Sequence, residues 1–215
     1  MPRSGGSWAG EATVTATLQI GSSHPALSRI VFSHCIGIDD APFDRAYRGD
    51  VLVVGAVFAG LRLEGVLTTT VRRDGANATD RVATMIGRSK FAPQVQLLML
   101  QGIALAGFNV VDLQRLRKAL DVPVLAIARR RPRYDAIRRT LRARVPGGER
   151  KWRLIERLDP MERIAGVHVQ RDGLSRAEAE RVIRRTAVHG VIPEPLRTAH
   201  LIAGALGTGV SRGRT

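Results

Sequence analysis

Two adjacent aspartates, Asp39 and Asp40, follow a run of mostly apolar residues. The run predicts a β-strand over residues 30–39, which places the carboxylates at its end. Neighbouring side chains on a strand point to opposite sides, so we expect at most one of the two to face a given site. A carboxylate there, joined by another from elsewhere in the chain, offers the hard oxygen ligands that Mg²⁺ or Mn²⁺ requires. The alternative is that Asp40 makes a turn or caps a helix with Ala41-Pro42.

Two further acids follow the third predicted strand. Asp74 and Asp80 flank the start of a predicted helix over residues 80–86, and either can reach the same end of the sheet. Taken alone, Asp80 is better explained as a first-turn acid that complements the helix dipole, and the same holds for Asp112 in a later helix. Spacing therefore leaves open which acid would complete a metal site with Asp39.

Arginines at a strand end supply candidate phosphate ligands. Arg129, Arg130 and Arg131 directly follow a predicted strand over residues 122–128. Guanidinium groups in this position can clamp a phosphate or stabilise charge that develops on it, although such a run is otherwise an ordinary solvated loop.

A second polar group stands at the start of the last predicted helix, over residues 196–206. Glu194, Arg197 and His200 lie together there. A single histidine is usually a surface or packing residue, and the three residues together are more indicative of a functional site than His200 alone.

The segment LMLQGIALAGFNVVD, residues 98–112, joins a strand to a helix. Its apolar beginning predicts a buried, parallel-type strand that Gln101 and Gly102 end. Gly102, Gly107 and Asn109 then give a permissive backbone before the helix. Ligands and catalytic groups collect at the carboxyl ends of strands in open α/β sheets, so we expect this turn to be functional.

Alternating strands and helices must position these groups, and their pattern predicts one α/β domain over residues 29–212. Its central unit is a right-handed βαβ crossover. The expected strands are 30–39, 50–59, 61–72, 95–101, 122–128 and 167–170, and the expected helices are 80–86, 110–120, 134–143, 175–188 and 196–206. Pro146-Gly147-Gly148 predicts a loop. Residues 1–28, rich in Gly, Ser, Thr and Ala, are expected to form a mobile extension with one short strand at 12–20.

The chain is strongly basic, with 34 Lys and Arg against 19 Asp and Glu and a formal net charge of +15. Only Lys90, Lys118 and Lys151 are lysines, so 31 of the 34 basic residues are arginines. Guanidinium groups bind phosphate bidentately, and the charge therefore favours nucleic acid, DNA above all, over a general bias toward arginine. Aromatic residues make up 4%, which disfavours a platform that stacks single-stranded bases.

Cys35 is the one cysteine of the chain. It excludes an intramolecular disulfide and leaves no CxxC pair for zinc, so a cytoplasmic location is expected. No apolar run reaches about 18 residues, and we expect no membrane partner and no spanning helix. The sequence is compatible with a monomer or a homodimer.

Five segments, in order along the chain, resemble the endonuclease dU family, the archaeal relatives of endonuclease V. They are CIGIDDAPF at 35–43, VRRDGANATD at 71–80, QGIALAGFNVVD at 101–112, PVLAIARRRP at 123–132 and IPEPLRTAH at 192–200. The resemblance runs from about residue 36 to residue 211. It implies a ribonuclease H-like fold, a mixed β-sheet flanked by helices, and Mg²⁺- or Mn²⁺-dependent cleavage of nucleic acid that contains deaminated bases.

The resemblance also implies roles for single residues. Asp39 would be the first metal-binding aspartate, and the region from Asp74 to Asp80 would carry a second acid. Arg129 stands where the family motif ends in a lysine and, with Arg130, would hold the phosphate. His200, at the end of the C-terminal motif, would lie in or beside the metal shell.

The expected metal ligands are Asp39, Asp40, Asp80 and Gln101, and the expected catalytic residues are Asp39, Asp74, Asp80, Arg129 and His200. The residues expected to contact nucleic acid are Gly102, Gly107, Asn109, Arg129, Arg130, Arg131 and Arg197, with Glu194 as a motif residue. The altered base would enter a pocket lined by the glycine-rich backbone near residues 102–107.

Gln101 departs from the family pattern, because relatives commonly have an aspartate there. An amide can coordinate a metal through its carbonyl oxygen, but it adds no charge and cannot act as a base, whereas two-metal cleavage requires carboxylates. Two functions therefore stay open: a metal-dependent endonuclease acting on deaminated or damaged bases in DNA, and a catalytically weakened nucleic-acid-binding protein that keeps the nuclease fold. A phosphoesterase acting on a small nucleotide would leave most of the positive charge unexplained.

Overall fold

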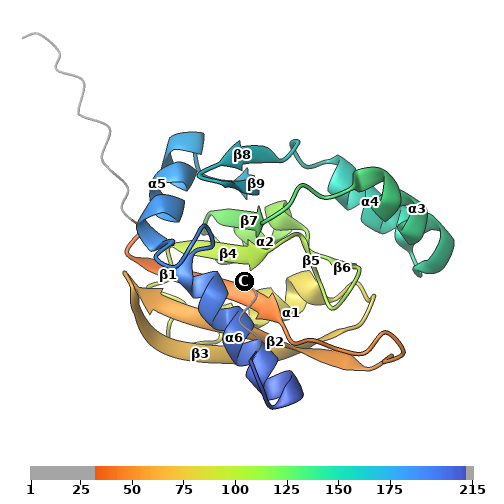
Figure 1. Ribbon diagram of the computed structural model, residues 1–215, viewed down its shortest axis with the longest axis horizontal. Coiled ribbons are helices and arrows are strands. Elements are labelled where there is room, and N and C mark those ends of the chain that lie inside the picture. The colour runs from red at the N-terminus through yellow and green to blue at the C-terminus, as the bar shows by residue number, and fades with distance from the viewer. Residues whose placement is uncertain (1–31, 212–215) are drawn as a thin grey trace, which may run out of the picture.

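A seven-stranded mixed β-sheet flanked by helices forms the centre of the computed structural model, which describes residues 32–211 (Figure 1). In spatial order its strands are β3 (Arg62–Arg72), β2 (Asp50–Ala59), β1 (His34–Asp40), β4 (Leu97–Gln101), β7 (Val124–Ala128), β9 (Val167–Asp172) and β8 (Glu162–Ile164). The helices are α1 (Ala78–Gly87), α2 (Leu113–Leu120), α3 (Tyr134–Arg144), α4 (Gly148–Glu156), α5 (Arg176–Thr186) and α6 (Glu194–Thr208). The predicted extension over 1–28 and its strand at 12–20 lie outside the described residues.

The three central strands, β1, β4 and β7, run parallel; β2 and β9 pair antiparallel with β1 and β7, and β3 and β8 pair antiparallel with β2 and β9. The apolar run of β4 is wholly buried, as expected of an interior parallel strand. β4, α2 and β7 form the predicted crossover unit, with β4 and β7 adjacent in the sheet. The carboxyl ends of β1, β4 and β7 therefore meet at one edge of the sheet.

The sheet separates two hydrophobic cores, because successive side chains on a strand face opposite sides. Ile36 and Ile38 of β1 pack on the side covered by α1, α2, α3 and α4, whereas Cys35 faces the side covered by α5 and α6. Continuing this alternation, Asp39 lies on the α6 side and Asp40 on the other. None of the helices within residues 32–211 is long and apolar enough to cross a lipid bilayer.

Gly37 sets the position of α6 across β1. A Cβ atom at Gly37 would collide with the backbone carbonyl of Pro195, in the first turn of α6. From this contact, Asp39 lies two residues or about 7 Å further along the strand, and His200 lies five residues or about 7.5 Å further along the helix. The close approach at Gly37 thus brings His200 level with Asp39.

Several predicted boundaries were wrong. The helix expected to begin at residue 110 begins at Leu113, because Ala104–Leu105 (β5) and Asn109–Val110 (β6) form a small hairpin first. Asp112 is the N-cap of α2, and its carboxylate accepts the amide N–H of Arg115.

Besides β5 and β6, two further elements were not predicted. α4 begins at Gly148, the last residue of the expected loop, and its few apolar positions among charged residues hid the helical period. β8 spans three residues, too few for any periodicity. The final helix starts at Glu194 rather than residue 196, since Pro195 in its first turn needs no backbone donor.

Candidate functional site

Asp39 and Gln101 end neighbouring strands at the carboxyl edge of the sheet. Ile38 pairs with Leu100 in the parallel register of β1 and β4, so the residues that follow each of them are neighbours on the same face. A cavity of about 580 Å³ opens at this edge and is lined by Asp39, Asp40, Ala41, Pro42, Phe43, Gln101, His200, Gly204, Thr208 and Val210. Three sequence-predicted groups, the two aspartates, Gln101 and His200, are brought together here by three separate elements.

Asp39 is paired with His200. The Nδ1 atom of His200 lies 2.8 Å from the Oδ2 atom of Asp39, whose residue is 5% exposed. The hydrogen bond to Asp39 is the main cause that raises the pKa of His200, while burial and the nearby Arg129 act in the opposite direction. The second carboxylate oxygen of Asp39 accepts the backbone N–H of Asp40 at 2.9 Å. This network fixes the Asp39 carboxylate at the wall of the cavity.

Asp40 lines the same cavity from the opposite side of the sheet. Its Oδ2 atom accepts the backbone N–H of Ala106 from the β5–β6 connection at 3.1 Å. Burial, and next the charge of Asp39, raise the pKa of Asp40 from 3.8 to about 7. The expectation that at most one of the two aspartates faces a given site is therefore wrong. The two residues lie on opposite faces of β1, but the cavity lies at the edge of the sheet and both of them line it.

The side-chain carbonyl oxygen of Gln101, Oε1, is buried and has no hydrogen-bond partner among the described residues. Buried polar atoms are normally paired, so an orphaned carbonyl oxygen beside two carboxylates fits a site whose ligand is a cation.

The donor set suits one hard cation rather than two. Within residues 32–211, no three His, Cys, Asp or Glu side chains come together as a ready-made metal site. Mg²⁺ commonly uses only one or two protein carboxylates and completes its shell with water and substrate phosphate oxygens. Asp39, Asp40 and the Gln101 carbonyl match this pattern, and two full carboxylate-held sites are not present in the described chain.

Asp74 belongs to a neighbouring cavity instead. It adopts a left-handed backbone with φ of 50°, at the turn after β3. Its carboxylate accepts the N–H of Phe108 at 2.8 Å and lies 3.3 Å from the Nε atom of Arg73, while its backbone oxygen accepts a hydrogen bond from the Lys151 ammonium. Gly107 permits this contact, because a Cβ there would meet the Asp74 carboxylate. Asp74 thus holds the β5–β6 connection in place and does not line the Asp39 cavity.

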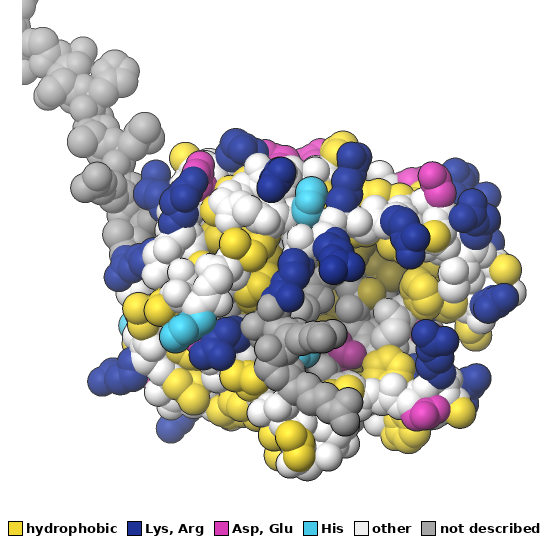
Figure 2. Space-filling model, in the orientation of Figure 1, with side chains coloured by type: hydrophobic (Ala, Val, Ile, Leu, Met, Phe, Trp, Pro, Cys, Tyr) yellow, Lys and Arg dark blue, Asp and Glu magenta, His cyan; other side chains and the backbone are white. Residues whose placement is uncertain are grey.

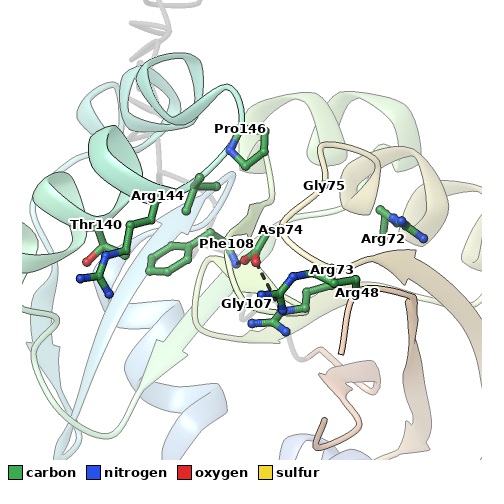
Figure 3. A pocket seen from close by; sticks show the side chains of 11 residues that line it. Arg48, Arg72, Arg73, Asp74, Gly75, Gly107, Phe108, Thr140, Arg144 and Pro146 are labelled. Atoms are coloured by element: carbon green, nitrogen blue, oxygen red, sulfur yellow. Dashed lines mark hydrogen bonds and ion pairs between the residues drawn. The ribbon is translucent and has the colours of Figure 1, made fainter. Parts of the chain in front are cut away.

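The cavity beside Asp74 has a volume of about 760 Å³ and is rich in arginine (Figure 3). It is lined by Arg48, Arg72, Arg73, Asp74, Gly75, Gly107, Phe108, Thr140, Arg144, Val145 and Pro146. In Figure 3 the Phe108 ring lies between Arg144 and the Asp74–Arg73 pair. Arg73 also donates to the backbone oxygens of Asp44, Arg45 and Tyr47, so it fixes the loop after β1. We call this space the arginine cavity.

The β5–β6 connection separates the two cavities. Phe43 lines the Asp39 cavity, lies against Gly107 and carries the Arg73 guanidinium over its ring at 5.3 Å. Ala106, one residue before Gly107, donates to Asp40. The two cavities are therefore adjacent, and residues 106–108 of this loop contact groups of both.

Two predicted site residues have structural roles. Asp80 is exposed on α1 and pairs with Arg115 at 2.6 Å, so the explanation as a first-turn acid is correct and the metal assignment is wrong. Asn109 is fully buried: its Oδ1 atom accepts the N–H of Ala78, and its Nδ2 atom donates to Arg72 and Asn77. The expected contact of Asn109 with nucleic acid is wrong, because all its polar atoms join β3 to α1.

Only one member of the C-terminal polar group reaches the site. Glu194 is buried and accepts from Arg197 at 2.9 and 3.0 Å and from His189 at 3.0 Å. Burial opposes ionisation of Glu194, but the hydrogen bonds from His189 and Arg197 prevail and hold its pKa below the ordinary value. This cluster secures the start of α6 and leaves His200, further along the helix, to face Asp39.

The arginines directly after β7 are exposed. Gln101 pairs with Ile127 in the register of β4 and β7, so Arg129 emerges beside the Asp39 cavity, where it acts on the pKa of His200. Arg130 and Arg131 are exposed. Gly102 has φ of 76° and open space around its Cα atom, so the backbone can be approached closely there.

Sequence reasoning named Asp74 and Gly107, which line the arginine cavity, but missed its arginines and Phe108. Arg48 lies outside the recognised motifs, Phe108 lies within the 101–112 segment without having been singled out, and Arg144 follows directly after the helix predicted over residues 134–143. Lys151 is 5% exposed, and burial lowers its pKa. Its one sequence signal was its rarity, as a lysine in a chain whose basic residues are nearly all arginines.

Comparisons with known proteins agree with this architecture. A protein of unknown function from Archaeoglobus fulgidus superposes with a TM-score of 0.76 at 36% identity, covering 82% of this chain and 99% of its own. An endonuclease V from Bacillus subtilis superposes with a TM-score of 0.51 at 11% identity, covering 82% of this chain and 81% of its own. The fold is therefore that of the endonuclease V class, as the sequence resemblance implied.

Sequence relatives narrow the assignment. The sequence model of endonuclease dU matches residues 32–207. A UPF0215 protein of Deinococcus radiodurans is 56% identical over 182 residues, which cover 85% of this chain and 93% of that protein. The chain belongs to the endonuclease dU family.

Proposed function

We propose that this protein is a metal-dependent endonuclease that cleaves duplex DNA at a deaminated base such as deoxyuridine or deoxyinosine. The observation that carries the proposal is the cavity that Asp39, Asp40, Gln101 and His200 line together, in which the Gln101 carbonyl oxygen has no partner among the described residues and Arg129 lies near His200. Membership in the endonuclease dU family supports the nuclease chemistry. A cytoplasmic location fits a chain whose one cysteine is buried and unpaired.

Asp39, Asp40 and Gln101 would hold one Mg²⁺ or Mn²⁺ ion. When bound, such an ion would polarise the scissile phosphate and lower the pKa of a coordinated water. Asp40 would be deprotonated on loading, because a cation replaces the proton that burial and Asp39 otherwise retain. His200 keeps the Asp39 carboxylate oriented through its Nδ1 atom.

Arg129 would hold the phosphate from the other side of the cavity. It follows the strand that pairs with β4 and is exposed, so its guanidinium is free to make bidentate contacts. Its charge would stabilise negative charge that develops on the phosphate during cleavage.

The arginine cavity would receive the altered base. Deamination replaces an exocyclic amino group by a carbonyl, so a hydrogen-bond donor becomes an acceptor. Arg48 and Arg144 offer donors to such a carbonyl, and Phe108 offers an aromatic face for stacking. Its volume of about 760 Å³ accommodates a flipped base, and its link to the Asp39 cavity through residues 106–108 would place the adjoining phosphate near the aspartates.

A second candidate is a protein that binds such DNA without cutting it. The neutral Gln101 favours this function, because an amide holds a divalent cation less strongly than a carboxylate. The retained Asp39–His200 pair favours the endonuclease, since a binding protein does not need a carboxylate buried beside a histidine.

One assay separates the two. The protein is incubated with Mn²⁺ and duplexes that contain deoxyuridine or deoxyinosine, with Asp39→Ala as the test variant and Asp80→Ala as the matched control. Cleavage by the unmodified protein and by Asp80→Ala, lost in Asp39→Ala, would support the endonuclease. Binding without cleavage that is unchanged in Asp39→Ala would favour the binding protein.

A further inference from the structure

The segment that follows β7 accounts for most of the net positive charge of the chain. Residues 129–157, which include α3 and α4, contain twelve Lys and Arg against three Asp and Glu, a net charge of +9 out of +15. All eleven arginines among them are exposed. Charge concentrated in this way in one exposed segment is what a polyanion partner requires, whereas a general arginine bias would spread it over the molecule.

The two helices separate an apolar side from a basic side. Tyr134, Ile137 and Leu141 of α3 pack into the core, together with Trp152 and Ile155 of α4. The arginines project outward, and Arg138 lies over the Trp152 ring at 5.3 Å. The helix pair is thus anchored by its apolar side and presents its arginines to solvent.

Arginines of both helices lie on one outer face. Arg142 donates to Glu149 at 2.9 and 3.3 Å, and the nearby charges of Arg153 and Arg138 also lower the pKa of Glu149. Of the eleven arginines, Arg142 alone pairs with a carboxylate within the described part of the chain. The others have no acidic partner there that would compete with a phosphate.

The helix pair adjoins the arginine cavity. Thr140 and Arg144, at the end of α3, line that cavity, and Lys151 of α4 donates to the backbone oxygen of Asp74 on its opposite wall. Figure 1 shows α3 and α4 projecting at one end of the molecule, and Figure 2 shows Lys and Arg side chains around the hollow on the same face. A duplex whose altered base occupies the cavity would therefore extend past these helices on one side.

We propose that α3 and α4 bind the sugar–phosphate backbone of duplex DNA on one side of the altered base. The path of the duplex past α3 and α4 rests on the proposed function, in which the altered base occupies the arginine cavity and the adjoining phosphate lies in the Asp39 cavity. α3 has 11 residues and a length of about 16 Å, which corresponds to about five base pairs at 3.4 Å each. Arg142 and Arg153, with the exposed Arg139 about one helical turn before Arg142, supply phosphate contacts that carry affinity but no sequence preference.

The test combines a protein change with a DNA change. The triple variant Arg139→Gln/Arg142→Gln/Arg153→Gln removes three charges and spares Arg138 over Trp152. If each removed arginine contacts one phosphate, the slope of log affinity against log salt falls by about 2.7, so between 50 and 200 mM salt the unmodified protein loses about 40-fold more affinity than the variant. Binding is measured by fluorescence anisotropy without divalent cations, so no cleavage is needed.

The DNA change shortens the duplex on one side of the altered base, from about ten base pairs, one helical turn, to about three. Shortening on the side bound by α3 and α4 is expected to weaken DNA binding by the unmodified protein and to leave binding by the triple variant nearly unchanged. Shortening on the other side is expected to weaken DNA binding by both proteins equally. A loss that is the same in both proteins for either side would overturn the proposal.

Two matched variants control for charge and folding. Arg181→Gln/Arg184→Gln/Arg185→Gln removes the same charge from the exposed side of α5, at the other end of the molecule in Figure 1, and is expected to keep the original salt dependence. A fall in the salt slope of this variant as large as that of the α3–α4 triple variant would also contradict the proposal. The variant Arg139→Lys/Arg142→Lys/Arg153→Lys keeps the charge and is expected to retain most of the affinity.

The outcomes for cleavage and for binding are independent. Cleavage of altered duplexes without any effect of the triple variant would leave the proposed function standing and refute the role of α3 and α4. The protein could instead bind without cleaving, with an affinity that depends on the length of the duplex on one side and a dependence that the triple variant abolishes. This outcome would support the role of α3 and α4 and refute the proposed nuclease activity.

Discussion

Replacing Asp40 by Asn is expected to stabilise the metal-free protein above neutral pH. Burial and the charge of Asp39 raise the pKa of Asp40 from 3.8 to about 7, so between these values the folded protein holds a proton that the unfolded chain has lost. A folded state that binds more protons loses stability as the pH rises, here through about pH 4 to 7, and the loss levels off above pH 7. The amide introduced by Asp40→Asn carries no proton to lose and can still accept the N–H of Ala106.

The size of the effect follows from the pKa difference. Each pKa unit corresponds to about 1.4 kcal/mol, so complete ionisation of Asp40 costs the folded protein about 4 kcal/mol. Part of that cost is already present at pH 5. The difference in unfolding free energy between Asp40→Asn and the unmodified protein is therefore expected to grow by about 2–3 kcal/mol between pH 5 and pH 8.5.

Urea denaturation with EDTA at pH 5, 7 and 8.5 measures this difference. His200 also loses stabilisation as the pH rises through its raised pKa, but both proteins retain His200 and its main partner Asp39, so most of this contribution cancels in the difference. The exposed Asp159→Asn serves as the control and is expected to track the unmodified protein. Parallel pH dependence in Asp40→Asn and the unmodified protein would refute the reasoning.

Mg²⁺ provides an independent readout of the same carboxylate. At pH 8.5 the ion is expected to raise the Tm of the unmodified protein, because it binds the folded state through the ionised aspartates. The shift in Asp40→Asn is expected to be much smaller, since one charged ligand is lost. Equal shifts in the two proteins would show that Asp40 is not a metal ligand.

Three further substitutions test the arrangement of the site. Gly37→Ala would push Pro195 and α6 away from β1 and is expected to lower the unfolding free energy by about 3 kcal/mol or more in a denaturation experiment. Gly87→Ala in α1 has room for the methyl group and is expected to leave the unfolding free energy unchanged or to raise it by up to about 1 kcal/mol. Gln101→Asp adds a negative charge at the unpartnered oxygen and is expected to tighten Mg²⁺ binding at least tenfold by calorimetry; weaker binding would argue against a cation there. Asp80→Asn is expected to change neither Mg²⁺ affinity nor stability by more than about 0.5 kcal/mol, because its pair with Arg115 is exposed, and a lost Mg²⁺ response would contradict its structural role.

The sequence by itself determined the class of the fold and the ends of its strands. The buried run before Gln101 predicted the central strand, because an interior parallel strand has no solvent face and reads as continuous apolar residues. Asp39 and the arginines from Arg129 were placed correctly at strand ends for the same reason. The motif order was also sufficient to identify the endonuclease dU family.

Only the tertiary structure decided which polar residues share a cavity. Spacing left open whether Asp74 or Asp80 joins Asp39, yet Asp74 lies in the arginine cavity and Asp80 on an exposed helix, and neither lines the Asp39 cavity. Asn109 looked like a loop residue open to ligand, but the β5–β6 hairpin buries it. Local sequence does not record such choices, because they depend on contacts between segments 30 or more residues apart.

The pairing of Asp39 with His200 is the clearest case. The two residues are separated by 161 positions in the chain, and their contact exists because α6 crosses β1 at Gly37. The sequence contains the carboxylate, the histidine and the glycine, but it does not show that they come into contact. Close packing of a helix on a strand, possible only where no Cβ intervenes, converts these separate residues into one site.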